Sequence, residues 1–228
     1  EELRREFGVR GAENIMVRGN PWSEGGGIQM ARAIGAKATL ERGAGFYGHA
    51  MPYPLDSIQP SDRTSLAMYH SEFSLVLDHD GKRFFDESDG YWWAAMEIAP
   101  RKTAILVTDE RIRQEQILHP ERAGYDHDLE TDKMSLAGQR GGNYAKAEAL
   151  EDLAPAVEAW GYDGKAVVES VRAFNEQVTT DPDSMTPPRK RARQPLDTPP
   201  YEVIEVQSTI TFAMAGLETD DDGRVLDQ

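Results

Sequence analysis

Short apolar runs separated by glycine and proline predict strands in the first half of the chain. Residues 74–78 and 103–107 are two such runs. The first is followed by Asp80 and Gly81, a pair that accepts the positive φ angles of a tight hairpin. We therefore expect a hairpin whose return strand starts at Lys82 and whose rigid exit holds the following residues in a fixed direction.

Apolar residues at helical spacing predict a helix over residues 26–34, and a glycine follows it as a natural terminator. Ile28, Ala31 and Ile34 fall on one face of this helix. We expect that face to pack against a sheet, with a further strand at residues 37–41.

Two amphipathic helices are predicted later in the chain, at residues 150–160 and 164–178, and Asp163 is placed to cap the second. The buried face of the second helix should consist of Val167, Val168, Val171, Phe174 and Val178. Both helices are assigned to the scaffold and not to a site.

Six prolines between residues 179 and 200 predict a long connection, because proline interrupts helices and central strands. Within it, residues 189–193 read Arg-Lys-Arg-Ala-Arg. Such a run can be an address signal or a phosphate-binding patch, but in this acidic chain we expect a solvated, salt-paired loop.

The acidic segment 220–223, Asp-Asp-Asp-Gly, resembles the start of a calcium loop. The alternating ligand spacing and the closing glutamate are missing, so a hairpin turn is the better interpretation. The sequence predicts no metal site.

Composition narrows the possible partners. With 228 residues and 39% hydrophobic content, the chain can bury the core of one sizeable domain, or of a domain with pieces of another. A formal charge of −15 disfavours binding to nucleic acid or to an anionic membrane. No apolar run approaches the roughly 20 residues that span a bilayer.

The chain has no cysteine, which rules out disulfides and thiolate metal sites. The first residues lack the apolar core of a secretion signal. A cytoplasmic location is the expectation.

Four segments of the sequence carry a family resemblance. Residues 81–87 read Gly-Lys-Arg-Phe-Phe-Asp-Glu and resemble the Gly-Lys-Arg-Phe-x-Asn-Glu segment of the FAD-dependent oxidoreductase family that contains fumarate reductase, succinate dehydrogenase, tricarballylate dehydrogenase and 3-ketosteroid dehydrogenase. Residues 25–36 look like the family's glycine-aspartate-glycine helix start, with Gly26 in place of the aspartate. Residues 210–217 and 223–227 resemble the segments that re-enter the flavin domain.

The resemblance implies an α+β fold, the capping domain of fumarate reductase-like flavoproteins, flanked by pieces of an α/β FAD-binding domain. Residues 1–44 would be a fragment of that FAD-binding domain, 45–201 the capping and substrate domain, and 202–228 the return into the FAD-binding domain. The implied cofactor is FAD, and the implied partner is a small-molecule substrate. The oligomeric state stays open.

A strand, a Gly-x-Gly-x-x-Gly turn and a helix normally hold the pyrophosphate of such a cofactor. Residues 43–48 match this pattern literally, but Pro52 and Pro54 follow and forbid the helix. We therefore interpret the match as accidental and expect the chain to be a central fragment that binds flavin weakly or not at all.

Oxidation or reduction of a carbon–carbon bond beside a carbonyl needs a hydride partner, a proton-transfer group and hydrogen-bond donors for the developing enolate. The resemblance implies that Tyr91 transfers the proton, where fumarate reductases have an arginine and 3-ketosteroid dehydrogenases use a tyrosine. Glu87, Arg83 or water would relay it. A phenol is a poor base at neutral pH unless its pKa is lowered. The alternative is that Tyr91 only fills the core beside Trp92 and Trp93.

The resemblance also implies substrate-binding residues. His49 would donate to a substrate carbonyl or carboxylate, and a packed or surface histidine is the alternative. Thr211 would donate to the substrate, and Phe212 replaces a histidine of the fumarate reductases. Ala215 and Gly216 would lie against the flavin.

The other histidines, His70, His79, His119 and His127, are interpreted as surface groups without metal-like spacing.

These observations favour part of a flavin-dependent oxidoreductase that acts on a carbon–carbon bond next to a carbonyl or carboxylate. One alternative is a non-catalytic ligand-binding or interaction domain that keeps the capping scaffold. A second alternative, a fumarate reductase proper, is disfavoured by Tyr91 and Phe212.

Overall fold

A computed structural model describes residues 9–20, 22–39, 45–54, 58–59, 61, 65–118, 132–214 and 216–227. The strands are β1 (Met16–Val17), β2 (Ala38–Thr39), β3 (Phe46–Pro52), β4 (Leu75–Leu77), β5 (Thr103–Thr108), β6 (Tyr144–Ala147), β7 (Tyr201–Ala213) and β8 (Gly216–Leu217). The α-helices are α2 (Gly26–Ala33), α3 (Tyr91–Ile98), α4 (Glu110–Ile112), α5 (Lys133–Gln139), α6 (Ala154–Ala159) and α7 (Gly164–Thr180). Short 3-10 helices lie at Ala12–Asn14, Tyr69–Glu72, Glu87–Asp89, Ala99–Arg101 and Leu150–Leu153, and a π-helical turn at Arg113–Leu118.

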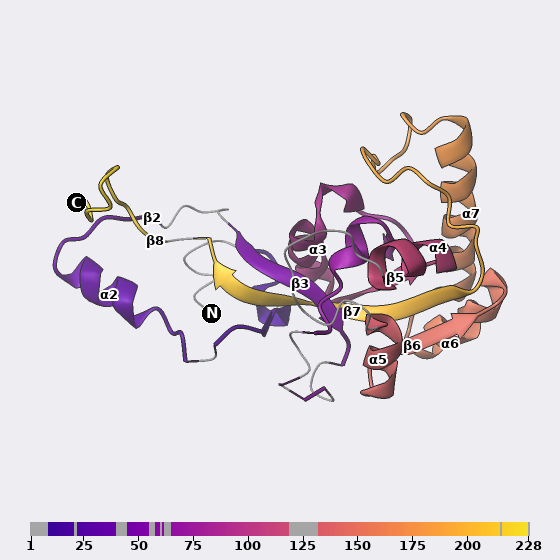
Figure 1. The fold of residues 1–228 in the computed structure, drawn as a ribbon, viewed down its shortest axis with the longest axis horizontal. Coiled ribbons are helices and arrows are strands. Elements are labelled where there is room, and N and C mark those ends of the chain that lie inside the picture. Colours follow the sequence, from indigo (N-terminus) through magenta and orange to yellow (C-terminus); the bar gives the residue numbers. More distant parts are fainter. Residues whose placement is uncertain are drawn as a thin grey trace.

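The long strand β7 organises the main sheet. On one side, β5 pairs antiparallel with residues 202–207 and β1 pairs parallel with residues 209–210. On the other side, β6 pairs with residues 201–204 and β3 with residues 206–213, both antiparallel. β4 extends the sheet beyond β5. Figure 1 shows β3 and β7 running side by side along the length of the molecule.

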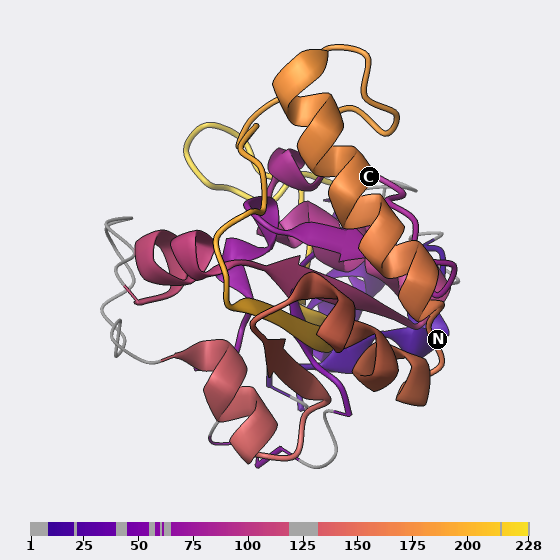
Figure 2. The same cartoon turned by 90° about the vertical axis from the view of Figure 1, so that its right-hand side faces the viewer.

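Both faces of this sheet are buried, which explains why its strands appear in the sequence as continuous apolar runs. All six residues of β5 are buried. Because successive strand residues point to opposite faces, Leu106 joins one core, with α3 and α5, whereas Ile105 and Val107 join the other, with α6 and α7. Figure 2 looks onto α7, which crosses the strands in front of this second core.

Several predictions of secondary structure are confirmed. The strand at 103–107 is β5, and the predicted amphipathic segments correspond to α7 and to α6 with the 3-10 turn before it. The carboxylate of Asp163 caps α7 by accepting from the amide of Ala166 at 2.9 Å. The five apolar residues expected on its inner face are buried.

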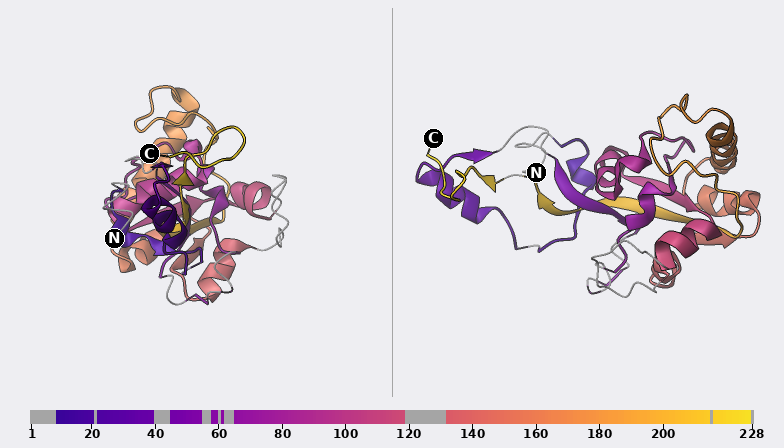
Figure 3. Two further views of the ribbon diagram at one scale, coloured as in Figure 1. Left: turned by 90° about the vertical axis from the view of Figure 1, so that its left-hand side faces the viewer. Right: turned by 45° about the horizontal axis from the view of Figure 1, so that its top comes forward.

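α2, β2 and β8 lie apart from the main sheet, at one end of the molecule (Figures 1 and 3). The helix forms where predicted, but none of its residues is buried, and Ile34 is 87% exposed. Its expected packing against a sheet is therefore confirmed only in part within the part of the chain that the structure describes, because Ile28 and Ala31 are half-buried and Ile34 is left uncovered. The short pair of β2 and β8 is its neighbouring element there.

The predicted hairpin is present in reduced form. Gly81 adopts φ 70°, and the Asp78 carboxylate accepts from the amides of Asp80 and Lys82. The expected return strand shrinks to a single bridge between Leu77 and Arg83, because the chain then turns into the 3-10 helix at Glu87–Asp89.

The remaining loops follow the sequence. Residues 181–200 contain neither helix nor strand, as their prolines predict. Residues 220–223 form the expected hairpin turn, with Gly223 at φ 79° and a bridge from Thr219 to Val225. Of the literal Gly-x-Gly-x-x-Gly match, residues 43–44 lie outside the described residues and 46–48 belong to β3.

Candidate active site

Five ring-bearing side chains from four elements meet beside β3. We call them the aromatic cluster, which consists of Tyr47, His49, Tyr69, Tyr91 and Phe212. β3 contributes the first two, the 3-10 helix Tyr69–Glu72 the third, α3 the fourth through its first residue, and β7 the last.

Tyr91 is the centre of this cluster. Its ring stacks on the imidazole of His49, with centroids 5.2 Å apart and planes at 7°. The ring of Tyr69 stands edge-on to it at 5.0 Å. Its hydroxyl lies 2.9 Å from the hydroxyl of Tyr47, and either oxygen can be the donor. On the outer side, Phe212 stacks on Tyr47 at 4.8 Å and is 55% exposed.

Two glycines give the cluster its backbone. A Cβ at Gly48 would come within 1.7 Å of the carbonyl oxygen of Thr209, so only glycine lets β3 lie this close to β7 beside His49. Gly90 has φ 121°, which allows the chain to turn from the 3-10 helix into α3 and aim Tyr91 inward.

His49 is the most unusual member electrostatically. It is 1% exposed, and neither ring nitrogen has a hydrogen-bond partner among the residues that the structure describes. Burial, reinforced by the positive charges of Arg18 and Lys133, lowers the pKa of His49 to about 3. The ring is therefore neutral at physiological pH and keeps one donor and one acceptor available.

Two cations border the cluster. Arg18 donates through Nη1 to the hydroxyl of Thr211 at 2.9 Å, and its buried Nε has no partner within the described part of the chain. The ammonium group of Lys133 lies 4.8 Å from the ring centroid of Tyr69. Burial and the charge of Arg18 lower the pKa of Lys133. The positive potential of these groups favours a ligand on which negative charge develops.

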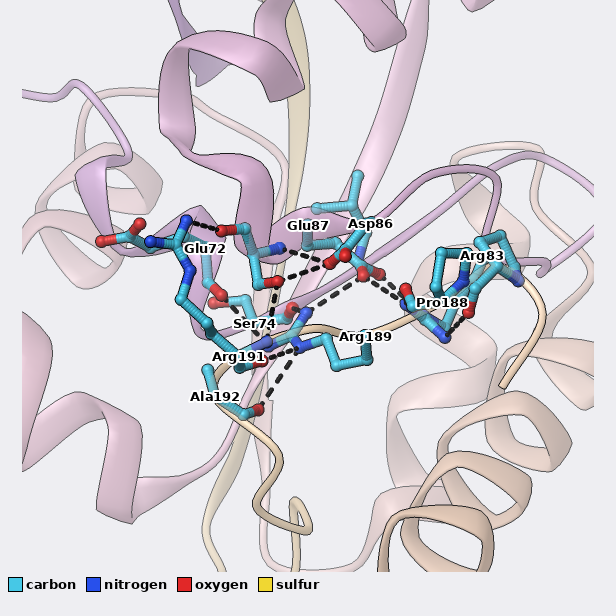
Figure 4. Close-up of polar contacts among 12 residues, drawn as sticks. Glu72, Ser74, Arg83, Asp86, Glu87, Pro188, Arg189, Arg191 and Ala192 are labelled. Carbon is cyan, nitrogen blue, oxygen red and sulfur yellow. Dashed lines mark hydrogen bonds and ion pairs between the residues drawn. The ribbon is translucent and has the colours of Figure 1, made fainter. Parts of the chain in front are cut away.

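Glu87 lies in a different environment, a buried cluster with Arg83 and Arg189 that we call the ionic cluster (Figure 4). Arg83 donates to both carboxylate oxygens, at 2.9 and 2.6 Å, and Arg189 adds a bond at 3.0 Å. The amide of Val76 completes the set at 3.3 Å. Both oxygens of this carboxylate therefore accept hydrogen bonds, and we call it saturated for that reason. These bonds stabilise the loop that leads to α3.

Arg189 corrects one prediction about the basic run. It is 1% exposed and donates to the carbonyl oxygens of Ser74 and Glu72 as well as to Glu87. The run is salt-paired as expected, but its first residue is not solvated, because it ties the long connection to the start of β4. Lys190, exposed and paired with Asp89, matches the prediction.

The structure therefore brings together His49, Tyr91 and Phe212, and it places Thr211 next to them through Arg18. Glu87 and Arg83 pair with each other within the ionic cluster.

The residues that the resemblance implies to face the cofactor lie further along the chain. Gly216 starts β8 and pairs with Thr39, and Ala215 lies outside the described residues. One of the other histidines differs from its prediction: His70 is buried, and burial lowers its pKa to about 3, whereas His79 is exposed as expected.

Sequence reasoning missed Tyr47, Tyr69, Arg18 and Lys133. Tyr47 carried a usable signal, because it precedes His49 by two residues in a strand and so shares its face. The other three come from segments far apart in sequence, and only the fold joins them. Within the described residues no group of three or more histidine and carboxylate side chains forms a metal site.

No helix among the described residues combines the length and apolar character needed to cross a membrane. No curated protein sequence matches the chain.

Solved structures with a similar fold belong to flavoenzymes. The 3-ketosteroid Δ1-dehydrogenase of Sterolibacterium denitrificans, in complex with 1,4-androstadiene-3,17-dione, aligns with a TM-score of 0.61 and 20% identity over 93% of this chain and 40% of that chain. A flavocytochrome c3 fumarate reductase aligns with a TM-score of 0.55 and 20% identity over 97% of this chain and 36% of that one.

A third neighbour is the 3-ketosteroid-Δ4-(5α)-dehydrogenase of Rhodococcus jostii RHA1, in complex with 4-androstene-3,17-dione. It has a TM-score of 0.50 and 17% identity over 97% of this chain and 42% of that chain. The chain thus spans less than half the length of each of these neighbours.

The family model of the FAD binding domain matches residues 2–228. This match covers almost every residue, and the mixed sheet and helices resemble those of fumarate reductase-like flavoproteins. The chain therefore belongs to the FAD binding domain family of FAD-dependent oxidoreductases, whose cofactor is FAD.

Proposed function

We propose that this chain is the cap-bearing central part of a flavin-dependent oxidoreductase that dehydrogenates or reduces a carbon–carbon bond next to a carbonyl or carboxylate. The observation that carries the proposal is the stack of Tyr91 on a buried, unpartnered His49. In this proposal residues 45–201 form the cap, and 1–44 and 202–228 are pieces of the FAD-binding domain.

Phe212 of the aromatic cluster and the residues near it fit one side of a flavin ring. Phe212 and Met214 expose apolar surface, and Arg18 carries an unpartnered buried Nε next to Thr211. A Cβ at Gly216 would meet nothing within 4 Å, so the backbone there is open to close approach. Flavin, when bound, supplies the hydride acceptor or donor.

Tyr91 is the proposed proton-transfer group, acting through its hydroxyl. The hydroxyl of Tyr47, 2.9 Å away, provides the next oxygen along which a proton can move. Neutral His49 would donate one N–H to the substrate carbonyl or carboxylate. The charges of Arg18 and Lys133 would stabilise the developing enolate and lower the cost of deprotonating the phenol.

Glu87 and Arg83 receive a positioning role in this proposal. Both carboxylate oxygens accept from arginines, so the carboxylate has little capacity to exchange a proton. The ionic cluster instead fixes the 3-10 helix that immediately precedes Tyr91. Water or Tyr47 would then take the relay role that the sequence assigned to Glu87 or Arg83.

A non-catalytic binding module is the second candidate. This candidate is favoured because residues 46–52 form the strand β3. No helix therefore follows the Gly-x-Gly-x-x-Gly match, and such a helix would be needed to hold a pyrophosphate. Titration of the longer native protein with FAD and with a 3-ketosteroid separates the two candidates. Steroid binding without any flavin binding in the longer native protein would favour the module.

The proposal is tested by Tyr91→Phe in full-length, FAD-loaded protein. General acid–base catalysis contributes roughly 10²–10⁴-fold, so we expect flavin reduction by a 3-ketosteroid, followed in single turnovers, to slow by that factor while flavin stays bound. Because two structural neighbours hold androstene-type ketosteroids, these are the first probes, and fumarate with a reduced dye is the second.

Tyr201→Phe is the matched control, because this tyrosine starts β7 and lies outside the aromatic cluster. It should leave the rate unchanged. Full turnover by Tyr91→Phe would remove the assignment.

A further inference from the structure

A pocket lies away from the aromatic cluster, and none of its lining residues belongs to that cluster. Its volume is about 410 Å³, and it is lined by residues that include Tyr53, Lys102, Asn143, Trp160 and Glu205. Small-molecule sites typically measure roughly 300–1,000 Å³. The pocket therefore has room for a metabolite-sized ligand.

Glu205 gives the pocket a buried negative charge. The residue is 3% exposed, and its carboxylate accepts from the side-chain amide of Asn143 at 2.6 Å and from the hydroxyl of Tyr162 at 3.0 Å. Both donors are neutral, and among the described residues no lysine, arginine or histidine forms an ion pair with Glu205. A carboxylate has about four acceptor positions, so capacity remains for a cation from the pocket.

The position of this carboxylate is fixed by a chain of hydrogen bonds. A hydroxyl has one proton, so Tyr162 donates to Glu205 and accepts from the hydroxyl of Thr103, which is 2.9 Å away. That hydroxyl in turn lies 3.2 Å from Nε2 of His79, whose ring stacks on Tyr162 at 4.3 Å. The acceptor is thus preorganised on the rigid strand β7.

Lys102 supplies the opposite charge at the rim. It is exposed, and no carboxylate among the described residues pairs with it. Its backbone has φ 71° and ψ −61°, a strained conformation that costs a non-glycine residue about 1–3 kcal/mol. A glycine would avoid this strain, so backbone stability alone does not favour a lysine at this position.

We infer that this pocket binds a small zwitterion of the amino-acid class. Its ammonium group would contact Glu205, its carboxylate would contact Lys102, and its side chain would pack on Trp160 and Tyr53. A simple anion would be repelled by the buried carboxylate. A metal ion is disfavoured, because no group of three histidine or carboxylate ligands occurs in the described part of the chain.

Isothermal titration calorimetry with three matched probes tests the inference. L-phenylalanine carries both charges, 2-phenylethylamine only the ammonium group and 3-phenylpropionate only the carboxylate; L-leucine, isopentylamine and 4-methylpentanoate repeat the comparison with an aliphatic body. We expect a dissociation constant of about 1 mM or lower for at least one amino acid. Its amine should bind at least about tenfold more weakly, as expected for one lost ion pair, and its acid should not bind.

Two variants locate the site. Glu205→Gln should abolish the signal, and Lys102→Gly should weaken amino-acid binding to the level of the amine while raising the melting temperature, because backbone strain is relieved. Glu169→Gln and Lys165→Ala change an exposed ion pair on α7 and should leave binding unchanged.

If Glu205→Gln fails to fold, Lys102→Gly decides the question alone. Equal binding of amine and amino acid, binding unaffected by Lys102→Gly, or the absence of binding by both amino acids would each overturn the inference.

Discussion

The aromatic cluster and the ionic cluster lie four residues apart in sequence, at Tyr91 and Glu87, and they satisfy their polar groups in opposite ways. In the ionic cluster, both oxygens of Glu87 accept from arginine donors. In the aromatic cluster, both ring nitrogens of His49 are buried without a partner from the described residues. The two environments suit different tasks: the ionic cluster holds the fold, and the aromatic cluster is the site that we propose for the ligand.

The free energies support this division. A buried polar group without a partner costs about 1–3 kcal/mol, so the fold loses stability at His49. A buried polar group that lacks a hydrogen-bond partner, with no gain in packing to offset it, is typical of functional sites. In the ionic cluster the carboxylate oxygens all have donors, so this cost is absent. Replacing a residue of the ionic cluster should therefore lower the free energy of unfolding more than it lowers the rate of the chemical step.

The largest stability effect is expected from Arg189→Met. The change removes one partner of the buried Glu87 carboxylate and leaves the carbonyl oxygens of Ser74 and Glu72 without their donor. We expect a loss of about 3 kcal/mol in the free energy of unfolding, measured by urea denaturation. Lys190→Met is the control, because its side chain is exposed, and it should change stability by less than about 1 kcal/mol.

Equal effects of these two variants would contradict the contrast between the clusters. A double variant gives a second test of this contrast. Arg189→Met leaves the charge of Glu87 partly uncompensated, and adding Glu87→Gln removes that charge. The double variant should then be more stable than the sum of the two single changes predicts.

The next largest effect is the pH dependence that His49 gives to stability. Its folded pKa of about 3 lies below the unfolded value of about 6.5. Between these pH values His49 binds a proton in the unfolded chain but not in the folded chain. The free energy of unfolding therefore falls as the pH falls through this window, by about 1.4 kcal/mol per pH unit. Above 6.5 the contribution is fully present, and below 3 no further loss follows.

Unfolding free energies between pH 6.5 and 4.5 test this expectation. His49→Gln should flatten the slope by about 1.4 kcal/mol per pH unit relative to the parent, and His70→Gln, which removes the second buried neutral histidine, should do the same. The two changes should add. An unchanged slope in His49→Gln would show that the imidazole is protonated in the folded protein.

Local patterns predicted the scaffold well. The capped helix α7, the strand β5 and the turn at Gly81 each depend on neighbouring residues, whose spacing and φ preferences are visible in the sequence. α2 also formed at its predicted position, but its burial depends on what surrounds it. Propensity indicates that an element forms, and only tertiary contacts determine which of its faces is covered.

The candidate site was only partly predictable for a related reason. The family-like segments pointed to His49 and Tyr91, which the fold places in contact. They did not predict that both carboxylate oxygens of Glu87 accept from arginines. The second of these arginines, Arg189, lies 102 residues away in a proline-rich connection. Long-range pairs of this kind leave no periodic signal in a single sequence.

The smallest expected effect concerns the hydrogen bond between the hydroxyls of Tyr47 and Tyr91. Tyr47→Phe keeps the stack on Phe212 and removes only this bond. In FAD-loaded full-length protein, we expect the chemical step to slow about tenfold, the value of one hydrogen bond of about 1.4 kcal/mol, with unchanged KM. The pH profile of that step should also shift to higher pH, because the phenolate of Tyr91 loses a donor. A purely structural Tyr47 would lower stability without moving this profile, and that result would confine proton transfer to Tyr91 alone.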